Sequence, residues 1–351
     1  MRGGSKMPRS RFFLVLTLSS VAFSCGNLDV LTPSGTSGPF LYVASGTCYG
    51  GGVAVSTASN TITKFDLATG AYDTLLVDYN SFSPSDSPVG MVNYSSSQIL
   101  VLVENASGRR IDLVDKTYYN TVTTYLVNST AMSAQLRGIF MSPDGGLLVS
   151  KGTALEKFSS NKSRITSGAN PFVSAPAGSC ATSTTLISSM TTLSNGKILY
   201  AHAAATPNNK FGVIAATGYS VSADCLSSQT APSTTALPTG IMMHTSGKIL
   251  VAYGSTTAGS NYVYSYDINP TTNAISNTAV AFSDSTIING PSAMALDSSS
   301  GNVYVANALS TSNTIEKFTY ASGALTRVGT SPYIPSQIYT RCVTSMMVST
   351  N

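Results

Sequence analysis

Few side chains in this chain of 351 residues suit acid–base or nucleophilic catalysis, because it holds only two histidines. His202 is expected at the end of one strand and His244 at the end of a strand that runs the opposite way, so the two are not expected to share a site. A serine hydrolase needs a histidine aligned with both a serine and a carboxylate, and no Gly-x-Ser-x-Gly sequence frames a serine here. Both histidines predict packing or surface roles, and no residue is predicted to be catalytic.

A set of polar residues near the ends of short apolar strands is the candidate for ligand binding. Its members are Arg137, Lys151, His202, Tyr253 and Asn307. Cations beside neutral hydrogen-bonding groups suit a small anion or a sugar, and solvated loop residues are the alternative. The basic pair Arg109-Arg110 has Asp112 and Asp115 close by, which indicates a locally compensated surface.

Methionine is enriched, and four of the 11 methionines take one place in repeated strands: Met91, Met190, Met294 and Met346. Thioethers can bind Cu(I). Ile139 and Ile241 take the same place in the other copies, however, which indicates hydrophobic packing. The sequence therefore predicts no metal and no cofactor.

The strands that carry these residues recur about every fifty residues, the mark of a repeat architecture. Each copy has a short apolar strand, a tight turn such as Ser142-Pro143-Asp144-Gly145, and a second strand such as Leu147-Leu148-Val149. A third strand alternates apolar and polar residues, as in Ile315-Glu316-Lys317-Phe318, and a fourth follows another turn. Four antiparallel strands repeated in this way form the blade of a β-propeller.

The two ends of the chain complete one another. The last copy has only its first strand, near Thr344 to Val348, and the missing second strand stands at the other end as Leu41-Tyr42-Val43. Pairing them removes two exposed sheet edges. The sequence therefore predicts an all-β fold over residues 39–351: a six-bladed β-propeller of four-stranded antiparallel blades, closed by the C-terminal strand pairing with N-terminal strands.

Two copies carry a family resemblance. Ala295-Leu296-Asp297 through Gly301 to Asn307, and Gly138 through Ser142 to Gly145, resemble the repeat of bacterial exported NHL/YVTN-type, lactonase-like propellers. The resemblance covers roughly residues 40–351 and implies blade construction, since the family includes both hydrolases and binding proteins. Its lactonases hold a cation in the central tunnel through carboxylates and asparagines. The matching column here has no carboxylate: Val89, Arg137, Ser188, Thr239, Ser292 and Thr344.

Four cysteines are expected on one face. In a propeller the loops before each first strand and after each second strand share a face, which we call the top face. Cys48 follows a second strand and Cys342 precedes the first strand of the closing blade, so a Cys48–Cys342 bridge would join the chain ends. Cys180 and Cys225 are the expected second pair. Four cysteines permit three connectivities, and the sequence alone does not choose among them.

The first 24 residues resemble an export signal. Basic residues precede an apolar run over Phe12–Phe23, which is too short to span a bilayer comfortably. Ser24-Cys25 resembles the end of a bacterial lipoprotein signal, with Cys25 acylated, residues 25–38 as a flexible tether, and Gly26 implying the outer membrane. Ordinary cleavage, which would release a soluble secreted protein, is the alternative.

The charge balance excludes nucleic acid as the expected partner. Four basic residues lie in the signal, so the rest of the chain holds 19 − 4 = 15 basic and 15 acidic residues. Nucleic-acid binders carry a basic face. We expect instead an outer-membrane lipoprotein, facing the periplasm or the cell surface, that binds an envelope protein or a glycan through its top-face loops. It would contact the membrane only through its lipid. The alternative is a lactonase-like hydrolase with its site at the tunnel mouth.

Overall fold

The computed structural model describes residues 38–47, 58–83, 85–105, 108–127, 136–151, 154–164, 186–203, 211–214, 224–225, 236–255, 257, 259–269, 271–272, 274–309 and 313–350. Backbone contacts divide the chain into Met1–Ser34, which lies outside the described residues, and Gly35–Asn351. The fold below is that of the second unit.

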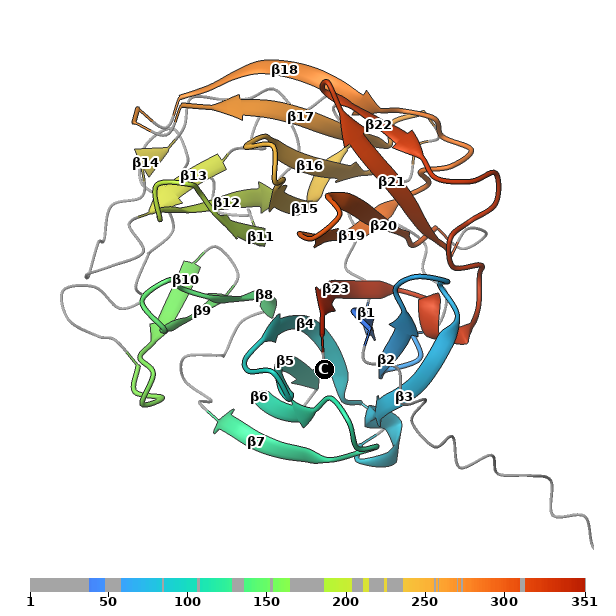
Figure 1. The fold of residues 1–351 in the computed structure, drawn as a ribbon. Coiled ribbons are helices and arrows are strands. Elements are labelled where there is room, and N and C mark those ends of the chain that lie inside the picture. Colours follow the sequence, from blue (N-terminus) through green and yellow to red (C-terminus); the bar gives the residue numbers. More distant parts are fainter. Residues whose placement is uncertain are drawn as a thin grey trace, which may run out of the picture. The chain divides into compact units, whose positions relative to one another are not determined.

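Six antiparallel sheets follow one another around a ring and form its blades (Figure 1). Blade 1 consists of β23 (Val343–Ser349), β1 (Phe40–Ser45), β2 (Thr61–Asp66) and β3 (Tyr72–Asp78). Blade 2 consists of β4 (Ser87–Asn93), β5 (Gln98–Asn105), β6 (Gly108–Asp115) and β7 (Val122–Val127). Blade 3 has three described strands, β8 (Leu136–Met141), β9 (Leu147–Lys151) and β10 (Ala154–Phe158).

The second half of the ring has the same design. Blade 4 consists of β11 (Leu186–Thr192), β12 (Ile198–Ala203), β13 (Phe211–Ile214) and β14 (Asp224–Cys225). Blade 5 consists of β15 (Leu237–Met243), β16 (Ile249–Gly254), β17 (Tyr262–Ile268) and β18 (Ile275–Phe282). Blade 6 consists of β19 (Pro291–Asp297), β20 (Asn302–Asn307), β21 (Ile315–Ala321) and β22 (Ala324–Arg327). In the described part of the chain, two short 3-10 helices, η1 (Tyr79–Ser81) and η3 (Ile338–Thr340), lie between blades in the sequence. The predicted six-bladed, all-β fold is confirmed.

The ring closes as the sequence predicts. Strand β23 pairs antiparallel with β1, and Met346 stands opposite Val43. The Lys116 ammonium group of blade 2 also holds the closing strand, because its Nζ donates to Ser349 Oγ at 2.8 Å and to the Thr350 carbonyl at 3.2 Å. The C-terminal strand is therefore tied to two blades at once.

The turns between first and second strands depend on glycine. Gly145 and Gly247 adopt φ values of 78° and 81°, a region that residues with a Cβ rarely occupy. The amide of Gly145 donates to the Ser142 carbonyl at 2.9 Å and closes the predicted Ser142–Gly145 turn. These turns fix the register that sends alternate side chains to the two faces of each blade.

The hydrophobic core is divided among the gaps between neighbouring blades. Phe40 and Tyr42 of blade 1, for example, pack with Ile99 and Val101 of blade 2. The four methionines of the repeated column belong to four different clusters. Each methionine therefore packs in a different gap between blades, as predicted, and all four also line the central cavity. Among the residues that the structure describes, none belongs to a helix with the length and apolarity that a membrane crossing needs.

Candidate functional site

The side chains predicted to bind a ligand are described at two positions. Tyr253 is 1% exposed, and its hydroxyl lies 2.8 Å from that of Tyr266. Asn307 is fully buried, and its amide nitrogen donates to the Ile287 carbonyl at 2.7 Å. Its amide oxygen accepts from the backbone N–H of Asn289 at 3.0 Å. Both side chains hold the fold together, and neither lines a described cavity.

The side chains of Arg137, Lys151 and His202 lie outside the described residues, so ligand binding by these three stays a prediction. His244 packs as expected. It is 5% exposed, its Nε2 lies 2.9 Å from the Gly301 carbonyl, and its ring centroid lies 4.7 Å from that of Tyr320.

The cysteine pairing also stays a prediction. Cys25, Cys48 and Cys180 lie outside the described residues, and only the backbone of Cys225 is described. Cys342 is fully buried, and its carbonyl accepts from the backbone N–H of Gly46 at 3.1 Å. This contact brings Cys342 next to the segment that leads into Cys48, as the predicted bridge requires.

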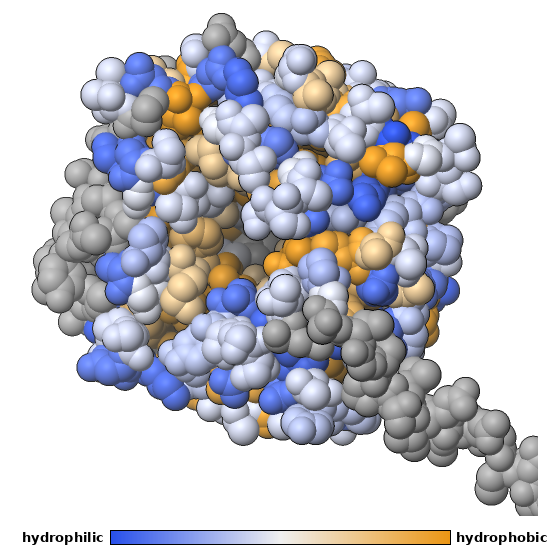
Figure 2. All heavy atoms as spheres, in the orientation of Figure 1, coloured by the Kyte–Doolittle hydropathy of each residue, from blue (hydrophilic) through white to orange (hydrophobic). Residues whose placement is uncertain are grey.

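The central tunnel is a narrow cavity of about 170 Å³, lined by the first strands of the blades. Figure 2 shows a hollow at the centre of the ring with hydrophobic residues around it. The Thr239 and Thr344 hydroxyls at its mouth donate to the carbonyls of Pro291 and Pro88, at 2.7 and 2.8 Å. These bonds join neighbouring blades. The lining residues that the structure describes include no carboxylate, the ligand that a hard cation prefers.

A larger cavity of about 380 Å³ lies on blade 2. One wall comes from the segment that connects β3 to β4, and the other comes from β5, β6 and β7. Six of its eight lining residues are polar or charged, and the full lining consists of Phe82, Ser83, Asp86, Asn105, Arg110, Asp112, Val122 and Thr124. Asp86 directly precedes β4 and Asn105 ends β5, so this part of the cavity lies at the top face. We call it the blade 2 pocket.

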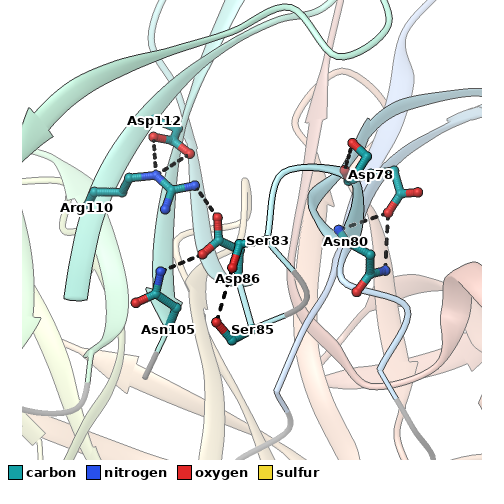
Figure 3. Close-up of polar contacts among 9 residues, drawn as sticks. Asp78, Asn80, Ser83, Ser85, Asp86, Asn105, Arg110 and Asp112 are labelled. Carbon is teal, nitrogen blue, oxygen red and sulfur yellow. Dashed lines mark hydrogen bonds and ion pairs between the residues drawn. The ribbon is translucent and has the colours of Figure 1, made fainter. Parts of the chain in front are cut away.

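Two carboxylates share one guanidinium group in the blade 2 pocket (Figure 3). Arg110 Nη2 donates to Asp86 Oδ2 at 2.6 Å, and Arg110 Nε lies 2.9 and 3.0 Å from the two oxygens of Asp112. Asn105 Nδ2 donates to the other Asp86 oxygen at 2.6 Å. The Asp86 and Asp112 side chains are only 2% and 1% exposed, whereas the Arg110 side chain is 24% exposed and reaches the solvent side of the cluster.

Burial shifts the pKa values of two side chains in and beside this cluster. Burial raises the pKa of Asp112 above its ordinary value, and the hydrogen bonds from Arg110 oppose that shift. Burial, together with the charge of Asp112, raises the pKa of Tyr79 well above its ordinary value. The Tyr79 hydroxyl is buried and has no hydrogen-bond partner among the described residues. Unsatisfied buried hydroxyl groups are rare in folded proteins.

The connecting segment is held by its own polar contacts. The Asp78 carboxylate caps η1 by accepting from the Asn80 backbone N–H at 3.0 Å, a contact that Figure 3 also shows. The Asn120 side chain, from the β6–β7 turn, accepts from the Asp78 N–H at 2.9 Å and donates to Ser81 Oγ at 3.2 Å. These bonds fix the wall that carries Phe82 and Asp86 against blade 2.

Sequence reasoning found only part of this site. The predicted association of Arg110 with Asp112 is confirmed, but the expected surface location is wrong for Asp112, which the connecting segment covers. Asp115 instead caps a turn, by accepting from the Thr117 N–H at 2.7 Å. Asp86 and Asn105 were not predicted. Their positions at the start of one strand and the end of the next are the only signal in the sequence for a top-face location.

No protein-family model matches the chain, and no curated protein matches it. Solved structures do. A chain of a nidogen/laminin complex is 12% identical, with a TM-score of 0.57, over 89% of this chain and 98% of its own. A protein of unknown function from Bacteroides caccae is 12% identical, with a TM-score of 0.54, over 89% of this chain and 99% of its own. A candidate 6-phosphogluconolactonase from Bacteroides uniformis is 13% identical, with a TM-score of 0.54, over 85% of this chain and 83% of its own.

Likeness at these identities shows the fold alone. The fold-level part of the predicted resemblance to lactonase-like propellers is thereby confirmed. These neighbours assign no activity to this chain, and its export from a bacterial cell stays a proposal.

Proposed function

We propose that this protein is an exported, ligand-binding β-propeller of the cell envelope, and that the blade 2 pocket binds a glycan. The observation that carries this proposal is the cavity of about 380 Å³ in which two buried carboxylates converge on one arginine and the Asn105 amide donates to one of them. Ligand sites are concave and contain a few convergent polar groups.

The pocket offers what sugar hydroxyls need, which is donors and acceptors side by side. Arg110 uses Nε and Nη2 for the carboxylates and makes no contact through Nη1 among the described residues, so a donor group is available. The Ser83 hydroxyl and the Thr124 side chain add further polar lining. Phe82 lines the pocket and is 51% exposed, so its ring is available for an apolar contact with a ligand.

The envelope location rests on the sequence. Acylated Cys25 and the tether 25–38 belong to this proposal, as do the Cys48–Cys342 and Cys180–Cys225 bridges, which suit an oxidising compartment. An intact mass of the protein from its native envelope, measured before and after reduction, tests all of them. A chain that starts at Cys25, carries added acyl mass and gains the mass of four hydrogens on reduction would support the lipid anchor and the two disulfides. An unacylated chain would overturn the anchor.

Binding is tested with the full chain, purified in detergent and titrated calorimetrically with a panel of neutral, acidic and amino oligosaccharides. The variant Asp86→Asn removes one carboxylate from the pocket and leaves Arg110 its contact with Asp112. The matched control is Asp267→Asn, which makes the same chemical change at a more exposed blade 5 ion pair with Lys248.

We expect at least one oligosaccharide class to bind. We expect Asp86→Asn to weaken that binding at least about tenfold and Asp267→Asn to leave it unchanged. If no class binds, or if the two variants weaken binding equally, the blade 2 pocket is not a glycan site.

A further inference from the structure

We propose that the blade 2 pocket selects amino sugars, by placing a protonated sugar amine against Asp86 and Asp112 while Arg110 and the neutral lining hold the hydroxyls. This inference rests on the proposed function and names the ligand class of the same site.

The charge count of the pocket carries the first step. Its lining contains two carboxylates and one guanidinium group, which leaves one negative charge in excess. The neighbouring cation Arg109 does not supply the balance, because its Nε pairs with Glu104 at 3.0 Å. A buried excess charge is unfavourable unless a partner compensates it. A ligand with one ammonium group supplies that compensation.

Blade architecture does not require the excess charge. Asp112, Glu156 and Glu316 occupy the same register of the third strand, since each stands opposite a valine that in turn stands opposite Met91, Ile139 or Met294. Glu156 pairs with Arg164 at 2.6 Å, and Glu316 pairs with Arg327 at 2.7 Å. An arginine paired with a carboxylate of this register is therefore a recurrent structural device. Asp86, which comes from the connecting segment, is the additional carboxylate in blade 2.

The Tyr79 hydroxyl is a further buried polar group beside this cluster. It makes no well-formed hydrogen bond among the described residues, and Asp112 is the charged group that affects it most, followed by Arg110 and Asp86. The surroundings favour a sugar over a simple amine, because hydroxyl and amide groups line the cavity and the exposed Phe82 ring stands at its rim. Aromatic rings also attract cations to their faces.

The test compares two oligosaccharides that differ only in the amine. The full chain is titrated with a β-1,4-linked glucosamine tetramer and with its fully N-acetylated counterpart, in slightly acid buffer that keeps the free amine protonated. We expect the free-amine tetramer to bind at least about tenfold tighter. Asp86→Asn should bring the two affinities within about twofold of each other, and the matched control Asp267→Asn should keep the preference.

The outcomes separate the two proposals. Equal affinity for both tetramers overturns the amino-sugar inference and leaves glycan binding in place. Binding of neither tetramer overturns the inference, and the wider oligosaccharide panel then decides the proposed function. If n-butylamine competes as well as the glucosamine tetramer, the pocket binds amines without reading the sugar. If Asp86→Asn still prefers the free-amine tetramer, the amine is recognised outside the blade 2 pocket, and the inference is overturned as well.

Discussion

Blades 2 and 6 place a carboxylate at the same register of the third strand and use it differently. In blade 6 one carboxylate, Glu316, meets one guanidinium group, and both side chains are largely buried, at 3% and 16% exposure. In blade 2 one guanidinium group serves two carboxylates beside a cavity, and its side chain is 24% exposed. The blade 6 pair is balanced and structural. The blade 2 cluster has one carboxylate more than the blade 6 pair, and the proposed amine ligand would compensate it.

The largest effect is expected from Glu316→Gln. This change leaves Arg327 largely buried, and among the described residues its hydrogen-bond partner besides the new amide is the Thr330 carbonyl, at 2.9 Å. Breaking a buried ion pair by removing one member costs about 3–5 kcal/mol. Urea denaturation of the variant should show a loss of that size. A loss below about 1 kcal/mol would mean that the pair is no more structural than a surface pair.

The double variant Asp86→Asn with Asp112→Asn should cost about 3 kcal/mol, because Arg110 then has no carboxylate. The loss should lie at the lower end of the range for blade 6, since Arg110 is more exposed than Arg327. A double-mutant cycle from urea denaturation measures the effect. The double loss should exceed the sum of the single losses, because either carboxylate alone satisfies the arginine. Additive losses would contradict the shared-arginine interpretation.

The ring could be predicted from the sequence because its strands repeat. The blade 2 pocket could not, because it depends on contacts between segments that are separate in the sequence. The alternating pattern of Ile315–Phe318 predicts a strand with two different faces. The strand Leu41–Val43, which the last repeat lacks, predicts the closure of the ring. Both predictions depend only on short stretches of sequence. Asp112 also occupies a polar position in such a pattern, but whether a polar face meets solvent depends on what covers it. In this blade the covering segment comes from the connection between blades 1 and 2.

The same limit explains the ligand-binding residues proposed from the sequence. Tyr253 and Asn307 stand at strand ends, where a pattern predicts solvated loops, yet neighbouring segments bury both. Asn289, Ile287 and Thr314 surround the amide of Asn307, and they lie in segments on both sides of it in the chain. Periodicity along one strand carries no information about such partners.

The single variant Asp112→Asn should change the free energy of unfolding by less than about 1 kcal/mol, in contrast to Glu316→Gln. Asp86 still compensates Arg110, and the new amide oxygen still accepts a hydrogen bond. Urea denaturation under the same conditions as for Glu316→Gln gives the comparison. A loss as large as that of Glu316→Gln would show that Asp112 is as structural as its counterpart in blade 6.

The smallest effect is the pH dependence of that difference. Burial raises the pKa of Asp112 above 3.8, so the folded state holds a proton at this carboxyl more tightly than the unfolded state does. Stability from this group is therefore greatest below pH 3.8 and declines as pH rises from there through the raised pKa. The charged groups that face Asp112 are Arg110 and Asp86, with the Tyr79 hydroxyl beside them. Asp112→Asn removes this titration.

The measurement is the free energy of unfolding of wild type minus that of Asp112→Asn, followed from acid to neutral pH. The difference should fall as pH rises. Subtracting the variant cancels the titration of carboxyls elsewhere, provided that the substitution is local. A difference that rises with pH would mean that Arg110 stabilises the ionised Asp112 more than burial destabilises it. Arg110 would then stabilise the ionised Asp112 as Arg327 stabilises Glu316 in blade 6. Asp86 would be the one carboxylate of the pocket whose charge Arg110 leaves uncompensated.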